Sequence, residues 1–162
     1  MKKSLFITYT CRREQSRHSL FNQIFTKLKK DEIAFQIISF AESNEEPILS
    51  KSGLDVPTKS IGLDILKRSS PLVLLREIYK ARPDHLLIGG YGHIENWIAL
   101  FYAIVFRLPV TLWSGAGSDS SESNSKVKKI FKIFFVKNVS NAVAYGSKAK
   151  NYLESLSNNK IR

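Results

Sequence analysis

Short apolar segments rich in β-branched and aromatic residues alternate along this chain with segments whose apolar residues recur at helical spacing. The expected strands cover residues 4–10, 33–40, 56–61, 85–91, 109–114 and 142–145. The expected helices cover residues 14–30, 63–81 (with a break at Pro71), 95–107, 126–137 and 147–156. Such alternation is typical of a parallel sheet covered by helices. We therefore expect an α/β fold: one Rossmann-like domain over residues 1–162, with a mostly parallel sheet and helices on both faces.

Composition limits the class of partner. The chain has 25 Lys and Arg residues against 14 Asp and Glu residues, a net charge of +11, which favours an anionic partner. No recognised nucleic-acid-binding motif accompanies this charge, so nucleic acid is not the expected partner. Cys11 is the only cysteine, which excludes an internal disulfide and indicates a reducing, cytoplasmic compartment. The longest apolar stretch, residues 97–106, is far shorter than the roughly 20 residues of a membrane-spanning helix.

The loop after the first expected strand is rich in arginine. Ligands of open parallel sheets bind beyond the carboxyl ends of the strands, and Arg12, Arg13 and Arg17 follow the first strand. This loop has no glycine fingerprint, and the chain has no Walker A loop, so conventional NAD or nucleotide binding is not expected. The arginines either hold a phosphate at a helix amino terminus or are solvated cations near Glu14.

The segment from Gly89 to His93 is the most informative candidate site. Its glycines allow a ligand or another backbone to approach closely, and a histidine there can act as a general acid or base. The alternative interpretation is an ordinary strand-to-helix turn. Besides the arginines, the candidate residues for binding an acceptor or a phosphate are Gly90, Gly92, Glu95, Asn96, Ser114, Gly115 and Tyr145. His18 and His85 are not spaced with a carboxylate pair, so no metal site is expected.

The expected helix over residues 126–137 is both basic and amphipathic. Its apolar stripe comprises Val127, Ile130, Phe131 and Phe134, with Phe135 as a candidate fifth member, whereas Lys128, Lys129 and Lys132 point elsewhere. One interpretation is a helix docked on the sheet by this stripe, with its lysines in solvent. The other is that the exposed lysines, with an extra apolar residue, face an anionic membrane surface.

Three longer segments resemble a known family. These are RPDHLLIGGYGHIENWIALFYAIVFRLPVTLWSGAGS (82–118), VKKIFKIFFVKN (127–138) and AVAYGSKAKNYLESL (142–156). Together they resemble the amino-terminal domain of GT-B glycosyltransferases of the family-4 type. Members have two Rossmann-like domains: the amino-terminal one handles the acceptor, and the carboxyl-terminal one binds the nucleotide-sugar donor.

The resemblance implies that this chain is the acceptor-binding half of a glycosyltransferase, acting on a glycan or lipid-linked acceptor in polysaccharide biosynthesis. Residues 157–162 fall about where the family crosses to its donor domain. We therefore expect no cofactor in this half, no activity alone, and a separate donor-binding subunit as the partner. If Trp113 and residues 115–124 are exposed, they flank the place where that domain docks. The expected location is cytoplasmic, peripheral at the inner face of the membrane. The alternative is a non-catalytic anion- or membrane-docking module, or the remnant of a truncated gene.

Overall fold

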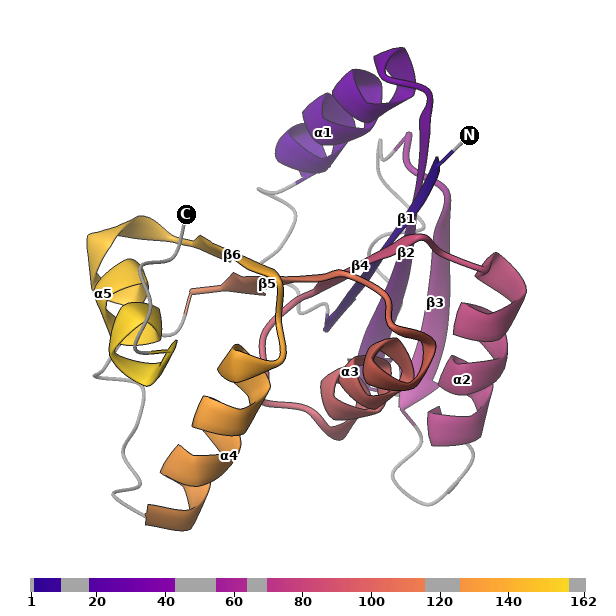
Figure 1. The fold of residues 1–162 in the computed structure, drawn as a ribbon. Coiled ribbons are helices and arrows are strands. Elements are labelled where there is room, and N and C mark those ends of the chain that lie inside the picture. Colours follow the sequence, from indigo (N-terminus) through magenta and orange to yellow (C-terminus); the bar gives the residue numbers. More distant parts are fainter. Residues whose placement is uncertain (1, 10–17, 43–54, 64–69, 116–125, 158–162) are drawn as a thin grey trace.

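All six strands of the central sheet run parallel, in the order β3-β2-β1-β4-β5-β6 (Figure 1). The computed structural model describes residues 2–9, 18–42, 55–63, 70–115 and 126–157. The strands are β1 (Lys2–Tyr9), β2 (Ile33–Glu42), β3 (Thr58–Leu63), β4 (His85–Ile88), β5 (Val110–Ser114) and β6 (Asn141–Ala144). The helices are α1 (His18–Lys30), α2 (Ser70–Ala81), α3 (Ile94–Phe106), α4 (Lys126–Lys137) and α5 (Gly146–Ser157). The predicted single Rossmann-like α/β domain is confirmed.

The strand order reverses between β1 and β4. From β1 the chain moves outward through β2 to the edge strand β3, and then returns to place β4 on the other side of β1. The register pairs Leu5 with Leu86 and Ile7 with Ile88, so the carboxyl ends of β1 and β4 lie side by side. This is the topological switch point at which open parallel sheets bind ligands.

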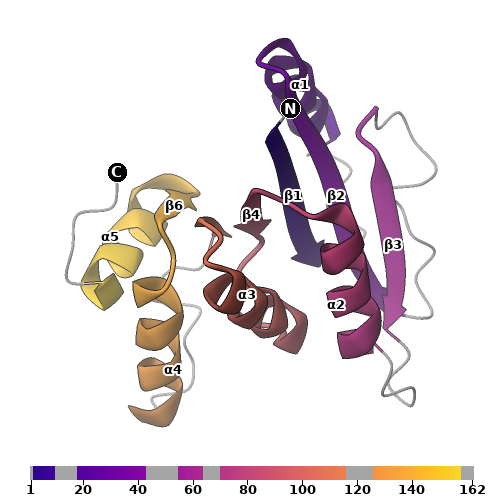
Figure 2. The ribbon, with the colours of Figure 1, turned by 45° about the vertical axis from the view of Figure 1, so that its right-hand side comes forward.

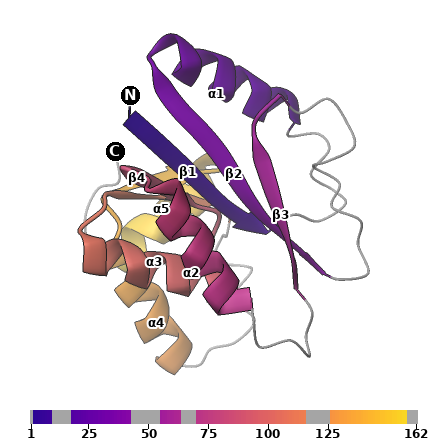
Figure 3. The ribbon, with the colours of Figure 1, turned by 90° about the vertical axis from the view of Figure 1, so that its right-hand side faces the viewer.

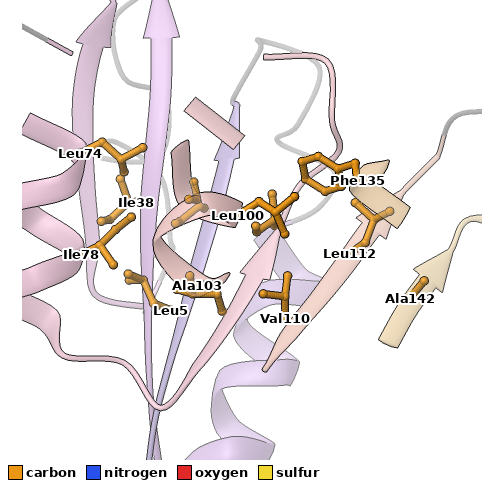
Figure 4. Close-up of a cluster of buried hydrophobic side chains, with 14 of the residues drawn as sticks. Leu5, Ile38, Leu74, Ile78, Leu100, Ala103, Val110, Leu112, Phe135 and Ala142 are labelled. Atoms are coloured by element: carbon orange, nitrogen blue, oxygen red, sulfur yellow. The ribbon is translucent and has the colours of Figure 1, made fainter. Parts of the chain in front are cut away.

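Helices cover both faces of the sheet, but unequally. Because strand side chains alternate between faces, Leu5 and Ile7 of β1 enter the core shared with α2, α3, α4 and α5, which Figure 4 shows in part. Phe6 points the other way and packs on Phe21 of α1, with a ring-centroid distance of 5.6 Å. Figures 2 and 3 show α1 alone on that second face. The larger core therefore lies under α2, α3, α4 and α5.

Several element boundaries differ from those expected. Pro71 is the second residue of α2, where its missing N–H leaves no hydrogen bond unmade, so it starts this helix rather than breaking it. The strand β4 ends at Ile88, three residues before the expected end, because Gly90 has a φ of +95°. The helix α5 begins at Gly146, one residue before the expected start at Ser147.

The helix α4 has the expected bounds, but most of its apolar stripe does not face the sheet. Phe135 and Val136 are the residues buried in the core, and they set the rotation of the helix. The other four residues of the predicted stripe are consequently exposed: Val127 (60%), Ile130 (65%), Phe131 (55%) and Phe134 (43%). Of the predicted stripe only Phe135 docks α4 on the core, so the prediction is wrong for these four residues.

The helix α3 is apolar on its outer face as well as its inner face. Ala99, Leu100 and Ala103 are buried against the sheet, whereas Phe101 and Val105 are half or more exposed. A helix that is apolar on all sides is usually buried all round, so the exposed outer face of α3 is unusual. Within the described residues, no helix is long and apolar enough to cross a membrane.

Candidate functional site

The candidate site lies at the carboxyl edge of the sheet, where the loops after β4, β5 and β6 meet the end of β1 (Figure 1). Backbone hydrogen bonds extend the pairing into these loops: the Gly89 N–H donates to the Ile7 carbonyl at 2.8 Å. In the same way, the Tyr145 N–H donates to the Ser114 carbonyl at 3.1 Å. The candidates predicted after β4, β5 and β6 therefore share one edge of the sheet.

The two positions that follow β4 require glycine for different structural reasons. A Cβ atom at Gly89 would lie 2.7 Å from the Thr8 Oγ1 atom, so the switch point closes only around a glycine here. Gly90 adopts a positive φ, which side-chain-bearing residues rarely do. At Gly92, by contrast, a Cβ atom would meet nothing within 4 Å. The turn is thus tight at its base and open to solvent at its tip.

The first turn of α3 stabilises this loop from inside. The Asn96 side chain is buried, and its Nδ2 donates to the Gly89 carbonyl at 3.3 Å. Glu95 is also buried, in the first helical turn, where the helix dipole favours a carboxylate. Both residues were predicted to bind an acceptor or phosphate. In this structure the Asn96 amide holds the glycine turn in place.

His93 occupies the N-cap position of α3, with its side chain exposed at the site edge. Its backbone is extended (φ −109°, ψ 147°), and its carbonyl accepts a hydrogen bond from the Asn96 N–H at 3.2 Å. The imidazole makes no capping hydrogen bond to the helix. An imidazole exposed in this position can exchange a proton with a ligand at the carboxyl edge.

The ends of β5 and β6 close the far side of the site. Ser114 is buried, and a Cβ atom at Gly115 would lie 2.9 Å from Cδ2 of Tyr145, so the tyrosine ring covers that glycine. The Tyr145 ring lies 5.7 Å from the Trp113 ring. Trp113 in turn stacks on Phe6 and is half-buried on the α1 face, with its Nε1 buried and unbonded within the described part of the chain. Trp113 is therefore less open to a docking domain than expected.

Sequence reasoning missed Thr8 as a residue of this site. Thr8 is buried at the end of β1 and lies directly under Gly89. The available signal was a polar residue near the end of an apolar strand that precedes a ligand-binding loop. Arg12, Arg13 and Arg17, and the loop 116–125, lie outside the described residues, so their predicted roles stay predictions.

The three lysines predicted to face a membrane do not behave alike. Lys128 and Lys129 are exposed. Lys132 is half-buried: its Nζ donates to the Tyr152 hydroxyl at 3.1 Å and lies 5.8 Å from the centre of the Tyr91 ring. Burial raises the pKa of the Tyr91 hydroxyl, so that ring stays neutral beneath the ammonium group. No group of three or more potential metal ligands occurs in the part of the chain that the structure describes.

A groove of about 860 Å³, the α3–α4 groove, opens beside the candidate site. Ile94, Trp97 and Phe101 of α3 form one wall. The opposite wall, from α4, comprises Lys128, Ile130, Phe131, Lys132 and Phe134. Tyr91 and Gly92 form its end, so the groove begins at the loop that carries His93.

No protein-family model matches this sequence, and no curated protein matches it. Solved structures do match. The UDP-GlcNAc 2-epimerase from Neisseria meningitidis, bound to UDP-GlcNAc, aligns with 96% of this chain at 17% identity and a TM-score of 0.64. A putative UDP-N-acetylglucosamine 2-epimerase from Listeria monocytogenes aligns with 95% at 14% identity and 0.63. The S. aureus MnaA–UDP structure aligns with 97% at 15% identity and 0.65.

The chain spans 43%, 42% and 41% of those three chains, respectively. Identities this low show the fold alone. This chain has the fold of one Rossmann-like half of a GT-B-like protein.

Proposed function

We propose that this chain is the acceptor-side domain of a glycosyltransferase of the family-4 type, which transfers a sugar from a nucleotide-sugar to a glycan or lipid-linked acceptor. The observation that carries the proposal is the half of a GT-B-like fold whose switch-point edge carries Gly90, Gly92 and His93. An open glycine turn with an exposed histidine suits a hydroxyl-bearing acceptor, because the ligand can approach the backbone closely.

In this proposal His93 is the general base. The acceptor hydroxyl oxygen attacks the anomeric carbon of the donor, the bond from that carbon to the nucleoside diphosphate breaks, and His93 takes the hydroxyl proton. Gly90 and Gly92 leave room for the acceptor, and Asn96 keeps the turn in shape through its bond to the Gly89 carbonyl. Arg12, Arg13 and Arg17 bind a phosphate of the acceptor.

Transfer requires a second domain that binds the donor, whether it belongs to the same polypeptide or to another. A single half of the cleft neither orients the donor sugar nor stabilises the charge that develops on its departing diphosphate. Proximity and orientation are worth about 7–11 kcal/mol of a barrier in favourable cases, so their loss abolishes measurable turnover.

Half of a nucleotide-sugar epimerase is the second candidate, because the solved structures with this fold carry that name. Epimerisation needs no acceptor, however, and the α3–α4 groove leads away from the same glycine turn. The groove is lined by exposed apolar side chains, which do not match a polar, soluble sugar nucleotide. This mismatch favours the transferase over the epimerase.

The test compares membranes from source cells that lack this chain with the same membranes after addition of the purified protein. Each sample receives a panel of radiolabelled nucleotide-sugars, and the label in lipid and polymer fractions is counted. We expect addition of the chain to restore incorporation from one donor. We expect His93→Ala to lower the restored rate by about 10²-fold or more, as for loss of a general base.

Gln23→Ala, an exposed polar change on α1, is the matched control and should restore the full rate. Incorporation that is unaffected by the absence of the chain would contradict the proposal. So would epimerised nucleotide-sugar formed without any acceptor, which would support the second candidate. Turnover by the chain alone would show that one lobe contains a complete site.

A further inference from the structure

The outer surface of α3 and α4 is unusually apolar for a face in contact with solvent. On α3, Ile94 is 63% exposed and Phe101 51%; on α4, Ile130 is 65% exposed and Phe131 55%. These four side chains all line the α3–α4 groove. Contiguous exposed apolar surface of this kind marks an interaction site rather than scattered surface residues.

The groove is formed by aromatic rings. Trp97 lies between the helices, with ring-centroid distances of 5.0 Å to Phe135, 5.7 Å to Phe131 and 6.4 Å to Phe134. Its Nε1 donates to the Tyr91 carbonyl at 3.1 Å, which fixes the indole at the base of the groove. The groove is therefore preformed, and its volume of about 860 Å³ is in the range of small-molecule sites.

The charge around the groove is positive. The sequence of α4 carries five lysines and no acid, and Lys128 and Lys132 line the groove itself. On α3 the sole acidic residue, Glu95, is buried. An occupant with an apolar chain and an anionic group therefore matches the groove in both respects.

We propose that the α3–α4 groove binds the hydrocarbon chain of a phosphate-bearing lipid, with the lipid's head group at the Gly92–His93 end. This inference rests on the proposed function and specifies its acceptor as lipid-linked. The continuity of groove and site supports it, because Tyr91 and Gly92 belong both to the end of the groove and to the glycine turn. A chain in the groove places its head group beside His93, and Lys128 neutralises its phosphate.

The two tryptophans of the chain allow a direct test, since Trp97 lies in the groove and Trp113 lies on the α1 face of the sheet. In Trp113→Phe, Trp97 is the sole reporter; in Trp97→Phe, Trp113 is. Both variants are mixed with phosphatidylglycerol vesicles whose acyl chains carry bromine, a quencher at short range. Co-sedimentation measures the bound fraction in the same samples.

We expect the brominated chains to quench Trp97 strongly and to leave the emission of Trp113 nearly unchanged. Binding should weaken as salt rises, because Lys128 and Lys129 are exposed cations. Vesicles of phosphatidylcholine, which carry no net charge, should sediment little of the protein. Free inorganic phosphate at the same concentration should not displace the vesicles, because it lacks the chain.

Two pairs of matched variants distinguish binding in the groove from nonspecific adsorption to the vesicles. Ile130→Asp places a charge in the groove, whereas Leu72→Asp places one on α2 at a residue that is 70% exposed. We expect only the first to abolish sedimentation. Lys128→Glu with Lys129→Glu should weaken binding by about tenfold or more. Lys27→Glu with Lys30→Glu on α1, the same charge change, should have little effect.

Equal quenching of both tryptophans, or unchanged binding by Ile130→Asp with a native circular-dichroism spectrum, would overturn the inference. Tight binding to uncharged vesicles would overturn the role of the lysines. This experiment uses no nucleotide-sugar, so its failure is separate from that of the proposed function. If added chain restores transfer to a water-soluble glycan while Trp97 is never quenched, only the lipid inference is lost.

Discussion

His85 lies at the amino end of β4, opposite the candidate site, and it is held between two hydroxyl groups. Its Nδ1 lies 3.0 Å from Ser4 Oγ and its Nε2 lies 2.9 Å from Thr111 Oγ1. Both contacts suit a neutral ring. One hydroxyl group can donate to the unprotonated ring nitrogen, while the other accepts from the ring N–H. Burial lowers the pKa of His85 below its usual value of 6.5. This histidine therefore joins β1, β4 and β5, and its burial favours the uncharged ring.

We predict that the free energy of unfolding falls as the pH drops from 7.5 to 5. The unfolded chain binds a proton at His85 near pH 6.5, whereas the folded chain resists that proton until lower pH, so acid favours unfolding. Stability from this residue is complete above the unfolded pKa and is lost as the pH falls through the folded one. Urea unfolding at pH 7.5 and pH 5.0 measures the change.

His85→Gln is the informative variant, since its amide can still bond to one hydroxyl but does not titrate. We expect its unfolding free energy to change distinctly less between the two pH values. His18 and His93 remain in both proteins and so cancel in the comparison. An identical pH dependence in the variant would mean that His85 is not the cause.

At this scale the sequence predicts some contacts and not others. Glycines at the end of an apolar strand predict a close approach, and Gly89 does lie against Thr8. The partner itself, however, is distant in sequence, and only the pairing of β1 with β4 brings it there. The same limit applies to Lys132, whose contact with Tyr152 depends on how α4 packs against α5.

At the scale of the elements, sequence periodicity failed to predict the rotation of a helix about its own axis. The bounds of α4 were exact, yet of the expected stripe only Phe135 is buried, together with Val136. The stripe at 127, 130, 131 and 134 is as apolar as the residues that are buried, so spacing alone could not choose between the two faces. Tertiary packing settles the choice, because Phe135 and Val136 join the core cluster that contains Leu112 and Ala142.

The helix α3 gives an element-scale prediction, because it has two apolar faces in different environments. Leu100 is fully buried, whereas Val105 is 73% exposed. We expect Leu100→Ala to destabilise the protein by about 2–5 kcal/mol, through lost burial and a cavity. Val105→Ala should change stability by no more than about 0.5 kcal/mol, as at other exposed sites. Chemical denaturation measures both.

If Leu100→Ala and Val105→Ala lowered the free energy of unfolding by similar amounts, the outer face of α3 would be covered in solution. A second copy or another part of the protein would then cover it. Sedimentation velocity on the wild-type chain separates these cases. A monomer with a costly Val105→Ala would mean that another part of the protein, rather than a second copy, covers this face.

For the whole molecule, alternation of strands and helices predicts the parallel class but not the strand order. Nothing in the periodicity states that β4 returns to the far side of β1, and the switch point depends on that return. The strand order is therefore a finding of the structure, and the solved structures that align with this chain share its fold. A donor-binding domain and a lipid acceptor concern chemistry beyond this lobe, so they remain proposals.

The arrangement of one sheet between two cores predicts how the chain unfolds. The two cores share every central strand, since Leu5 and Ile7 enter one while Phe6 enters the other. Neither core can be lost while β1 stays ordered, so we expect one cooperative transition, as in most single domains of this size.

Trp97 reports on the core under α3, and Trp113 on the core under α1. In each single-tryptophan variant, the urea midpoint from fluorescence should equal that from far-ultraviolet circular dichroism. If Trp113 lost its native signal at lower urea than the helices, α1 and its core would form a separate unit that opens first, and the shared-sheet explanation would be wrong.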